Sequence, residues 1–337
     1  MMSDKATSQT SANAPIRVAI NGYGNLGRGV ELAAQKTPDI EVVTVFTRRD
    51  PASLTTLGAP VHHVDNLHCF EGKLDVVINC GGSATDLIDQ TPQTTTMFNT
   101  VDTFDTHARI PEHFARVDAQ ARAHDRLTLI STGWDPGLFS LMRCYFGSVL
   151  PDGDTYTFWG RGVSQGHGDA LRRVPGVANA VQYTVPVEEN RQRILGGEHI
   201  ELTTRAGHRR VCYIVPEDGA DLARIQEEIV TMPMYFDQYD TEVNFITAEE
   251  LARDHSGMPH GGSVIRLGNT SRDTKDVMSF NLDLGSNPEF TGSVALASAR
   301  AVARLYAAGQ RGAITVLDVP PSSFSPKTPA DLRATLL

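Results

Sequence analysis

Three glycines that directly follow a short apolar segment constrain the fold of this chain more than any other feature of its sequence. The segment "IRVAIN" has the apolar alternation of a strand, and Gly22, Gly24 and Gly27 follow it with the spacing GxGxxG. The residues after the last glycine have apolar positions at helical spacing. A strand, a glycine turn and a helix in this order begin a βαβ unit, so the sequence predicts a parallel sheet covered by helices.

Each of these glycines has a physical role in such a turn. Gly22 permits the tight turn, Gly24 lets the backbone approach a pyrophosphate, and Gly27 lets the helix pack closely against the strand. The helix N-terminus then presents N–H groups and a partial positive charge to phosphates. A glycine-rich turn that binds nothing is the alternative, and the strand–turn–helix context argues against it.

Two arginines follow the second predicted strand, "IEVVTVF", where an acidic residue would bind a ribose 2′-hydroxyl. Thr47, Arg48 and Arg49 occupy this position instead. A guanidinium can bind a phosphate through two hydrogen bonds and can stack on an adenine. The sequence therefore favours NADP over NAD, and a solvated surface pair is the alternative interpretation.

Strand-like and helical segments alternate over the first part of the chain, which predicts an α/β fold with a doubly wound parallel sheet of the Rossmann type. Further strands are expected over residues 74–82, 94–105 and 127–132, and a helix over residues 110–125. Beyond Trp134, strand-like segments separated by turn residues predict a second α+β domain built on a mixed sheet.

The same patterns suggest domain boundaries. We expect a disordered tail at residues 1–14, a dinucleotide-binding domain at 15–133, and a substrate-binding and dimerisation domain at 134–289. The C-terminal segment 290–337 contains a long Ala-rich helix that is expected to pack back on the first domain.

The composition excludes several classes of protein. The chain has 40 acidic and 30 basic residues, and a net charge of −10 argues against a nucleic-acid partner. The four cysteines lie far apart, so we expect no metal site and no disulfide framework, and a reducing cytoplasm fits best. We expect that the polar N-terminus is not a signal peptide, and no apolar run in the sequence is long enough to predict a membrane-spanning helix.

Longer motifs carry a resemblance to a known family. They are "RVAINGYGNLGRGVE", "TRR", "GSATD", "VDTFDTH", "STGWDPGLFS", "FWGRGVSQGHGDALRRVPGV", "AVQYT", "SGMPHGG" and "GAITVLDV". Together they resemble the meso-diaminopimelate dehydrogenases, and the similarity runs from residue 16 to about residue 320. The motifs "STGWDPGLFS" and "SQGHGDALRRVPGV" are long and far more specific than a dinucleotide motif.

This resemblance implies a defined reaction. Such enzymes use NADP to deaminate the D-configured centre of meso-2,6-diaminopimelate reversibly. The products are L-2-amino-6-oxopimelate, which cyclises to tetrahydrodipicolinate, together with ammonia and NADPH. The reverse reaction is a one-step branch of lysine biosynthesis, and the enzymes are cytoplasmic homodimers.

Two aspartates are the candidate catalytic residues. Asp105 and Asp135 each follow a predicted parallel strand, at the edge of the sheet where ligands bind. The resemblance implies that they hold the ammonium of the D-centre, and either could accept its proton and assist the attack of water on the imine. Read from their residue types alone, each could equally be a turn or a helix cap.

The resemblance also implies the remaining ligand-binding residues. Those expected to contact the substrate, besides the two aspartates, are Trp159, Gln165, Gly166, Thr184, Arg210, His260 and Asn287. Those expected to contact the cofactor are Gly22, Tyr23, Gly24, Asn25, Leu26, Gly27, Thr47, Arg48, Arg49, Gly82, Ser83, Ala84, Thr85, Asp102, Thr103 and Trp134. Arg209 is a further candidate for the distal carboxylate. Arg109 departs from the family pattern, which often has an acidic residue there, so no acidic role is transferred to it.

Two other functions remain open at this level. A D-amino-acid dehydrogenase of broader specificity could use the same scaffold, and only relative rates would distinguish it. A non-catalytic NADP-binding regulator is disfavoured, because Asp105, Asp135, Arg210 and His260 are all present.

Overall fold

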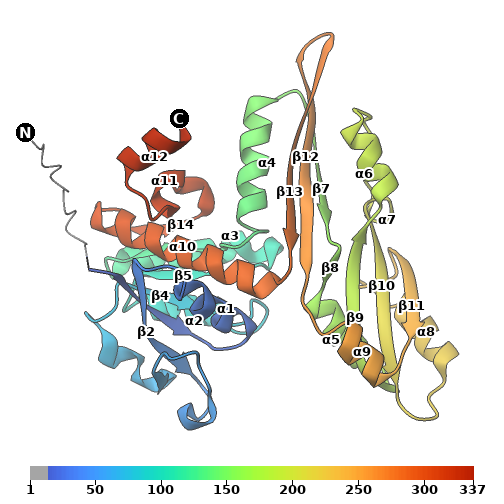
Figure 1. The fold of residues 1–337 in the computed structure, drawn as a ribbon, viewed down its shortest axis with the longest axis horizontal. Coiled ribbons are helices and arrows are strands. Elements are labelled where there is room, and N and C mark those ends of the chain that lie inside the picture. The colour runs from blue at the N-terminus through green and yellow to red at the C-terminus, as the bar shows by residue number, and fades with distance from the viewer. Residues whose placement is uncertain (1–13) are drawn as a thin grey trace, which may run out of the picture. The chain divides into compact units, whose positions relative to one another are not determined.

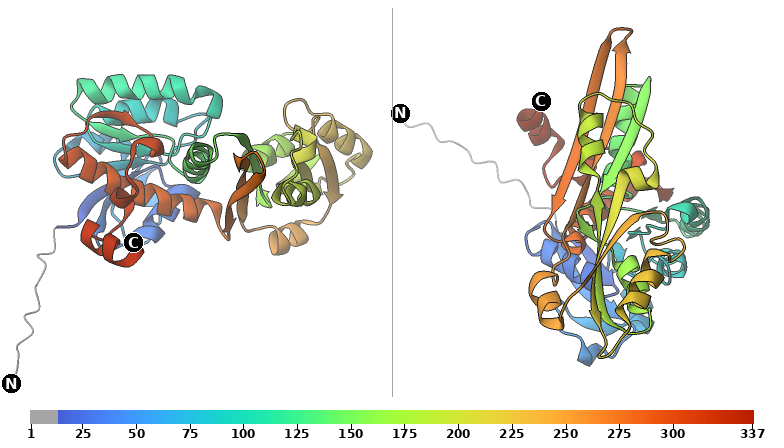
Figure 2. Two further views of the ribbon diagram at one scale, coloured as in Figure 1. Left: turned by 90° about the horizontal axis from the view of Figure 1, so that it is seen from above. Right: turned by 90° about the vertical axis from the view of Figure 1, so that its right-hand side faces the viewer.

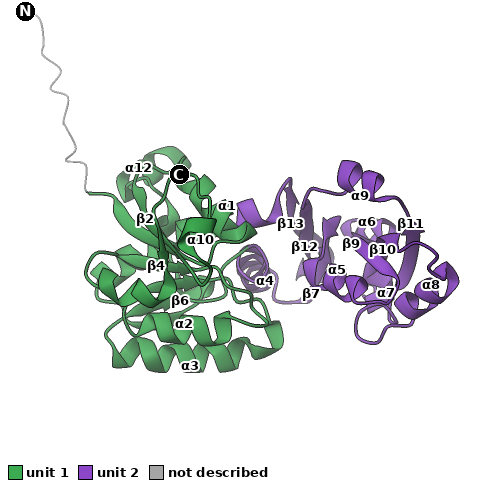
Figure 3. Cartoon of the chain, turned by 90° about the horizontal axis from the view of Figure 1, so that it is seen from below, with its two compact units in different colours: residues 1–133, 292–337 green, residues 134–291 purple. Residues whose placement is uncertain are grey.

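The computed structural model describes residues 14–337, which form two compact units (Figure 1 and Figure 3). Unit 1 comprises the chain up to Gly133 together with Gly292–Leu337, and unit 2 comprises Trp134–Thr291. Except for residue 14, the expected disordered tail lies outside the described residues.

Unit 1 is built on a seven-stranded sheet in which all the pairs are parallel. Its strands are β1 (Ile16–Asn21), β2 (Ile40–Thr47), β3 (Val61–His63), β4 (Val76–Asn79), β5 (Thr100–Asp102), β6 (Leu127–Leu129) and β14 (Gly312–Ile314). The strand order is β14-β6-β5-β4-β1-β2-β3, so the direction of winding reverses between β1 and β4. This confirms the predicted doubly wound α/β fold and places its ligand-binding switch point beside the glycine turn.

Helices cover both faces of this sheet (Figure 2 and Figure 3). One face carries α2 (Leu87–Thr95) and α3 (Ile110–Ala123), and the other carries α1 (Asn25–Ala34) and most of α10 (Asn287–Ala307). Small residues allow the close approach of α1 and α10, because a Cβ on Gly292 would lie 2.4 Å from the carbonyl carbon of Gly29. The remaining helices of unit 1 are η1 (Pro51–Ser53), η2 (Val64–Phe70), η3 (His107–Arg109), η4 (Val316–Asp318), α11 (Pro321–Phe324) and α12 (Pro329–Leu336).

The strand predicted over residues 94–105 is wrong in its extent. Residues 94 and 95 complete α2, and the strand itself is only Thr100–Asp102. The hydroxyls of Thr94 and Thr95 donate to carbonyls four residues earlier, at 2.8 Å each. These local bonds accommodate the threonines in a helix despite their preference for strands. The short strands β3 and β14 were not predicted.

Unit 2 contains two separate sheets. The mixed sheet has the order β11-β10-β9-β8, in which β11 (Asp240–Phe245) pairs parallel to β10 (His208–Pro216) and the other pairs, with β9 (Val177–Pro186) and β8 (Gly162–Val163), are antiparallel. The second sheet is antiparallel and joins β7 (Gly153–Trp159), β12 (His260–Ser271) and β13 (Thr274–Leu284). Figure 2 shows the long hairpin of β12 and β13.

The helices of unit 2 are α4 (Leu138–Val149), α5 (Gln165–Arg172), α6 (Glu188–Leu195), α7 (Thr204–Gly207), α8 (Leu222–Val230) and α9 (Ala248–Asp254). Apolar side chains of α8 and of the mixed sheet share one core, in which Ile225, Cys212 and Ile214 are fully buried. Across residues 14–337, none of the helices combines the length and the hydropathy required to cross a bilayer.

Candidate functional site

The glycine turn of unit 1 has the geometry that its spacing predicts. Gly22 has φ +104°, a value that favours glycine, and a Cβ on Gly27 would lie 2.3 Å from the carbonyl oxygen of Gly22. In contrast, a Cβ on Gly24 would meet no described atom within 4 Å. Gly22 and Gly27 are therefore required by the fold, whereas Gly24 borders open space at the N-terminus of α1.

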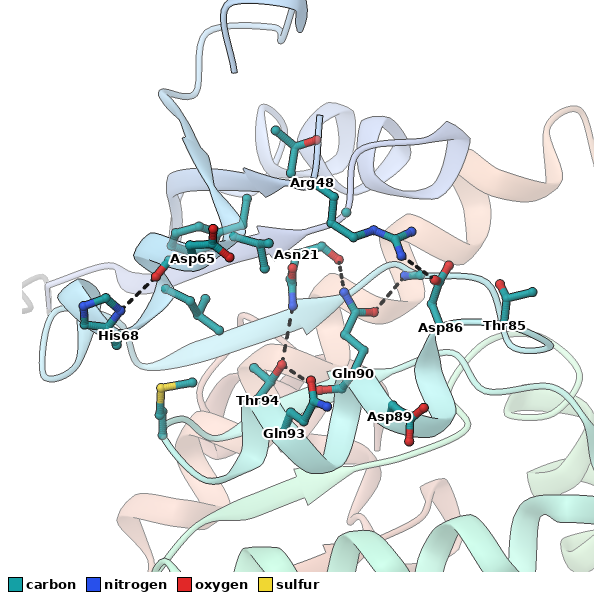
Figure 4. Close-up of a pocket in the computed structure, with 17 residues that line it drawn as sticks. Asn21, Arg48, Asp65, His68, Thr85, Asp86, Asp89, Gln90, Gln93 and Thr94 are labelled. Carbon is teal, nitrogen blue, oxygen red and sulfur yellow. Dashed lines mark hydrogen bonds and ion pairs between the residues drawn. The ribbon is translucent and has the colours of Figure 1, made fainter. Parts of the chain in front are cut away.

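A cavity of about 530 Å³ opens at the carboxyl ends of β1, β2 and β4 (Figure 4). Gly22, Thr47, Arg48 and Thr85, all predicted cofactor contacts, are among the residues that line it. Below them, the amide of Gln90 on α2 donates to the carbonyl of Asn21 and accepts from the backbone N–H of Gly81, each at 3.2 Å. Gln90 thus ties the two glycine-containing turns together, a role that its sequence context does not reveal.

The two arginines after β2 have different environments. The side chain of Arg48 is 76% exposed and forms an ion pair with Asp86 at 2.9 Å. Arg49 instead donates from Nη2 to the carbonyl of Tyr23 at 2.6 Å, and Thr47 is buried, with its hydroxyl accepting from the backbone N–H of Arg49 at 3.1 Å. Of the two arginines, Arg48 is consequently the one whose charged group is more available to a ligand.

The loop after β4 contacts the loop after β5. The hydroxyl of Ser83 accepts from the backbone N–H of Asp105 at 2.9 Å and lies 3.5 Å from the carbonyl of Thr103. Asp105 itself is exposed, and its carboxylate has no hydrogen-bond or ion-pair partner within residues 14–337. The structure therefore presents Asp105 as a free carboxylate beside predicted cofactor-binding residues.

The side chain of Asp102 points into the interior of unit 1 and is not available to a cofactor. Its carboxylate is fully buried, 2.7 Å from Nε2 of His113, and accepts from the backbone N–H groups of Phe104 (3.1 Å) and Ser131 (2.8 Å). Only the backbone of Asp102 remains for the predicted cofactor contact. The reason is the inward direction of its side chain at the end of β5, which the sequence could not specify.

In unit 2, Asp135 is held by two side chains that face it. Its side chain is 1% exposed, and its oxygens accept from Nη2 of Arg143 at 2.5 Å and from Nε1 of Trp159 at 2.6 Å. Trp159 remains 38% exposed, so its indole presents surface while its N–H is satisfied. The structure thus joins two predicted substrate residues and adds Arg143, which was not predicted.

A second group in unit 2 gathers three further predicted residues. Nε1 of Trp134 donates to the side chain of Asn287 at 2.9 Å, and its ring lies 4.8 Å from that of His260. Burial lowers the pKa of His260. The glycines after His260 are explained by strand packing, since a Cβ on Gly262 would lie 2.2 Å from the carbonyl oxygen of Phe158. They therefore give no separate indication of a ligand.

Arg210 is a buried cation. It is 7% exposed, donates to the hydroxyl of Thr184, and stacks on Tyr239 with 3.9 Å between the guanidinium carbon and the ring centre. Its Nε has no partner, and no carboxylate within residues 14–337 forms an ion pair with it. Burial lowers its pKa. A buried guanidinium without a carboxylate partner can be stabilised by an anionic ligand, which would compensate its charge.

Two histidines near Arg210 are kept neutral. Burial, together with the charge of Arg210, lowers the pKa of His167 and of His208 to about 4. Nε2 of His208 accepts from the backbone N–H of Trp159 at 2.8 Å, which connects the strand of Arg210 to the indole that contacts Asp135. Neither histidine was predicted, because an isolated histidine carries no distinguishing sequence pattern.

The remaining predicted substrate residues lie at the start of α5. The side-chain amide of Gln165 donates to Sδ of Met258 at 3.2 Å, and a Cβ on Gly166 would meet no described atom within 4 Å. No group of three or more metal-ligating side chains occurs among the residues that the structure describes.

Comparison with known proteins identifies relatives along nearly the whole chain. Residues 133–286 match the family described as the diaminopimelic acid dehydrogenase C-terminal domain. The meso-diaminopimelate D-dehydrogenase of Ureibacillus thermosphaericus is 55% identical over 323 residues, which are 96% of this chain and 99% of that protein.

Two solved structures are similar in fold and sequence. One is a sixfold variant of the Clostridium tetani E88 meso-diaminopimelate dehydrogenase with DAP, with a TM-score of 0.91, 51% identity, and coverage of 96% of this chain and 100% of that one. The other is an engineered D-amino acid dehydrogenase bound to NADP+, with a TM-score of 0.85, 44% identity and the same coverage.

Proposed function

The chain belongs to the meso-diaminopimelate dehydrogenase family, and we propose from this membership and from its site that it oxidises the D-centre of meso-2,6-diaminopimelate with NADP. The products are L-2-amino-6-oxopimelate, in equilibrium with tetrahydrodipicolinate, ammonia and NADPH. The observation that carries the proposal is Arg210, a buried guanidinium without a carboxylate partner among residues 14–337, in a unit that also holds a buried acceptor, Asp135.

The residues of unit 1 fit NADP. The open space at Gly24 and the helix N-terminus behind it suit a pyrophosphate, and Arg48 suits a 2′-phosphate. When bound, NADP supplies the acceptor for the hydride that leaves the substrate carbon. The relative that is bound to NADP+ supports this choice of cofactor.

The D-centre ammonium is assigned to the two aspartates. Asp135 is held in one orientation by Arg143 and Trp159, which suits an anchor for a cation. Asp105 has an exposed carboxylate without a partner among the described residues, so we assign to it the acceptance of the ammonium proton and the activation of water. Since the hydride passes from the substrate carbon to the cofactor, the main work of the protein apart from this proton transfer is orientation.

The distal L-centre is assigned to the residues around Arg210. Its guanidinium and the Thr184 hydroxyl can donate to a carboxylate, and an analogue without that carboxylate would leave the buried cation uncompensated.

The variant of the C. tetani enzyme supports this assignment. Its six substitutions replace a Gln, a Thr, an Arg, a Pro, a His and an Asn, and this chain has the same residue types at identical separations along its sequence. They are Gln165, Thr184, Arg210, Pro259, His260 and Asn287. Five of the six were predicted as substrate residues, and Pro259 was not.

We further propose a cytoplasmic homodimer that acts in lysine biosynthesis. Unit 2 carries exposed apolar side chains that a second copy could cover, among them Tyr145 (60% exposed) and Val149 (47% exposed) on α4 and Val277 (40% exposed) on β13. Light scattering at micromolar concentration tests the dimer, and a monomeric mass contradicts it.

The decisive assay for the reaction is NADP reduction with separated meso, LL and DD isomers of diaminopimelate. We expect activity with the meso isomer that exceeds activity with simple D-amino acids by at least about 100-fold, because the distal contacts contribute about 3 kcal/mol. Asp135→Ala should lose most turnover while it retains its affinity for NADPH.

A second candidate is a D-amino-acid dehydrogenase of broad specificity, favoured by the similarity to an engineered enzyme of that type. Comparable rates with meso-diaminopimelate and with simple D-amino acids would support it. Normal turnover of the Asp135→Ala variant would remove Asp135 from the reaction.

A further inference from the structure

Arg143 contacts the carboxylate of Asp135 along both of its oxygens. Nη2 lies 2.5 Å from Oδ1, and Nη1 lies 3.3 Å from Oδ2. Trp159 donates to Oδ2 from the opposite element, β7, at 2.6 Å. The side chain of Asp135 is 1% exposed and that of Arg143 is 30% exposed, so the pair is largely removed from solvent.

Arg143 is itself held in place from two sides. Its Nη1 lies 3.4 Å from the hydroxyl of Thr157 on β7, and its Nη2 lies 3.4 Å from the hydroxyl of Ser140, one turn earlier on α4. The guanidinium therefore bridges α4 and β7. The ion pair of Arg205 and Asp240 in the same unit has only one contact, at 2.8 Å, and both of its side chains are 58% exposed.

A carboxylate has about four lone-pair positions for donors. Arg143 and Trp159 occupy three of those of Asp135, which leaves one direction for an additional donor such as a substrate ammonium. A two-point contact between a guanidinium and a carboxylate also restricts rotation of the carboxylate plane. Removal of Arg143 would release that rotation and leave a buried negative charge uncompensated.

We propose that Arg143 is a positioning residue, which acts on the reaction through Asp135 by holding its carboxylate in the one orientation that leaves an oxygen directed at the substrate ammonium. This inference rests on the proposed function of Asp135. It assigns Arg143 no contact with the substrate or the cofactor, so its effect must disappear when Asp135 no longer carries a charge.

A double-mutant cycle tests this directly in the full-length protein. We expect Arg143→Met to lower kcat/KM for meso-diaminopimelate by at least about 50-fold, mostly through kcat, with the dissociation constant of NADPH within about twofold of the wild type. In the background of Asp135→Asn, the same substitution should change kcat/KM by less than about threefold. Arg205→Met is the matched control, which removes an exposed ion pair of the same unit and should leave kcat unchanged.

Two further measurements separate positioning from a general loss of stability. Arg143→Lys retains the charge but not the two-point contact, so we expect it to unfold near the wild-type temperature while its kcat falls at least about fivefold. Guanidinium ion at millimolar concentration should restore part of the kcat of Arg143→Ala and none of that of Asp135→Asn.

The proposal is overturned if Arg143→Lys has wild-type kcat, or if the losses from Arg143→Met and Asp135→Asn multiply in the double variant. The assay of the wild-type protein with meso-diaminopimelate tests the proposed function independently of these variants. Absence of activity there would reject the proposed function, whereas an active wild type with an active Arg143→Met variant would reject only the role of Arg143.

Discussion

Two arginines predicted to bind anions have opposite surroundings in this molecule. Arg48 in unit 1 is 76% exposed at its side chain and already forms an ion pair with Asp86. Arg210 in unit 2 is 7% exposed, stacks on Tyr239, and has no carboxylate partner among the described residues. The same side chain is thus a solvated surface group in one unit and a desolvated cation in the other.

This difference determines what each arginine can contribute. An exposed guanidinium is solvated in either state, so its contact with a phosphate is worth little more than a surface ion pair allows, about 1 kcal/mol. A buried guanidinium without an anion destabilises the fold, and a ligand carboxylate that enters recovers this free energy as binding. We therefore expect a small difference in affinity between NADP and NAD, and a large difference in activity between substrates with and without the distal carboxylate.

The largest effect should follow from Arg210→Met. We expect KM for meso-diaminopimelate to rise at least about 100-fold, because the carboxylate would lose its buried partner. The melting temperature should stay the same or rise, since an uncompensated buried charge is replaced by an apolar side chain of similar length. Steady-state kinetics and calorimetry measure the two quantities.

Arg209→Met is the matched control for this experiment. The sequence also made Arg209 a candidate for the distal carboxylate, but it is exposed on β10 beside the buried Arg210, and adjacent residues of a strand point to opposite faces. We therefore expect its replacement to change neither KM nor stability appreciably. If Arg210→Met instead lowered the melting temperature strongly at unchanged KM, the guanidinium would be a structural group and the contrast with Arg48 would fail.

An effect on stability is expected from pH. In the folded protein the pKa values of His167 and His208 are about 4, below the ordinary value of 6.5, because of burial and the charge of Arg210. Between these values the unfolded chain binds protons that the folded protein does not, so stability is complete above pH 6.5 and falls as the pH falls toward 4.

We expect these two histidines together to lower the free energy of unfolding by about 5 kcal/mol between pH 7 and pH 4.5, as measured by urea denaturation. His208→Gln should reduce the slope, whereas replacement of the exposed His124 should not. If the free energy of unfolding depended on pH identically in the wild type and in His208→Gln, burial and the charge of Arg210 would not lower the pKa of His208.

The smallest effect concerns the exposed arginine. Arg48→Ala should weaken NADP binding about tenfold and NAD binding less than about twofold, because the 2′-phosphate is the group that we propose it binds. Arg49→Ala should weaken both cofactors to a similar extent, since its guanidinium supports the carbonyl of Tyr23 in the glycine turn. Fluorescence titration with the reduced forms, NADPH and NADH, distinguishes the two patterns, and equal losses for Arg48→Ala would contradict phosphate recognition.

Much of the fold could be predicted because its signals are local. The turn from β1 into α1 depends on contacts within a few residues, such as that of Gly27 with Gly22, so spacing alone specifies it. The strand predicted at residues 94–105 is too long, because threonines occur in both helices and strands. Here the hydroxyls of Thr94 and Thr95 donate to carbonyls four residues earlier, and these two residues belong to the helix. The short strands β3 and β14 have too few residues to show a period.

The sequence by itself determined the fold class, the family and the residue types available to the site, since these follow from local spacing and from long motifs. Only the tertiary structure decided which polar groups are buried and which partner each receives. Asp102 turns to His113, Asp135 to Arg143, and Arg210 to the ring of Tyr239, across 11, 8 and 29 residues of chain respectively. The physical reason is that burial and charge compensation depend on side chains that converge from separate elements, and no local pattern encodes that convergence.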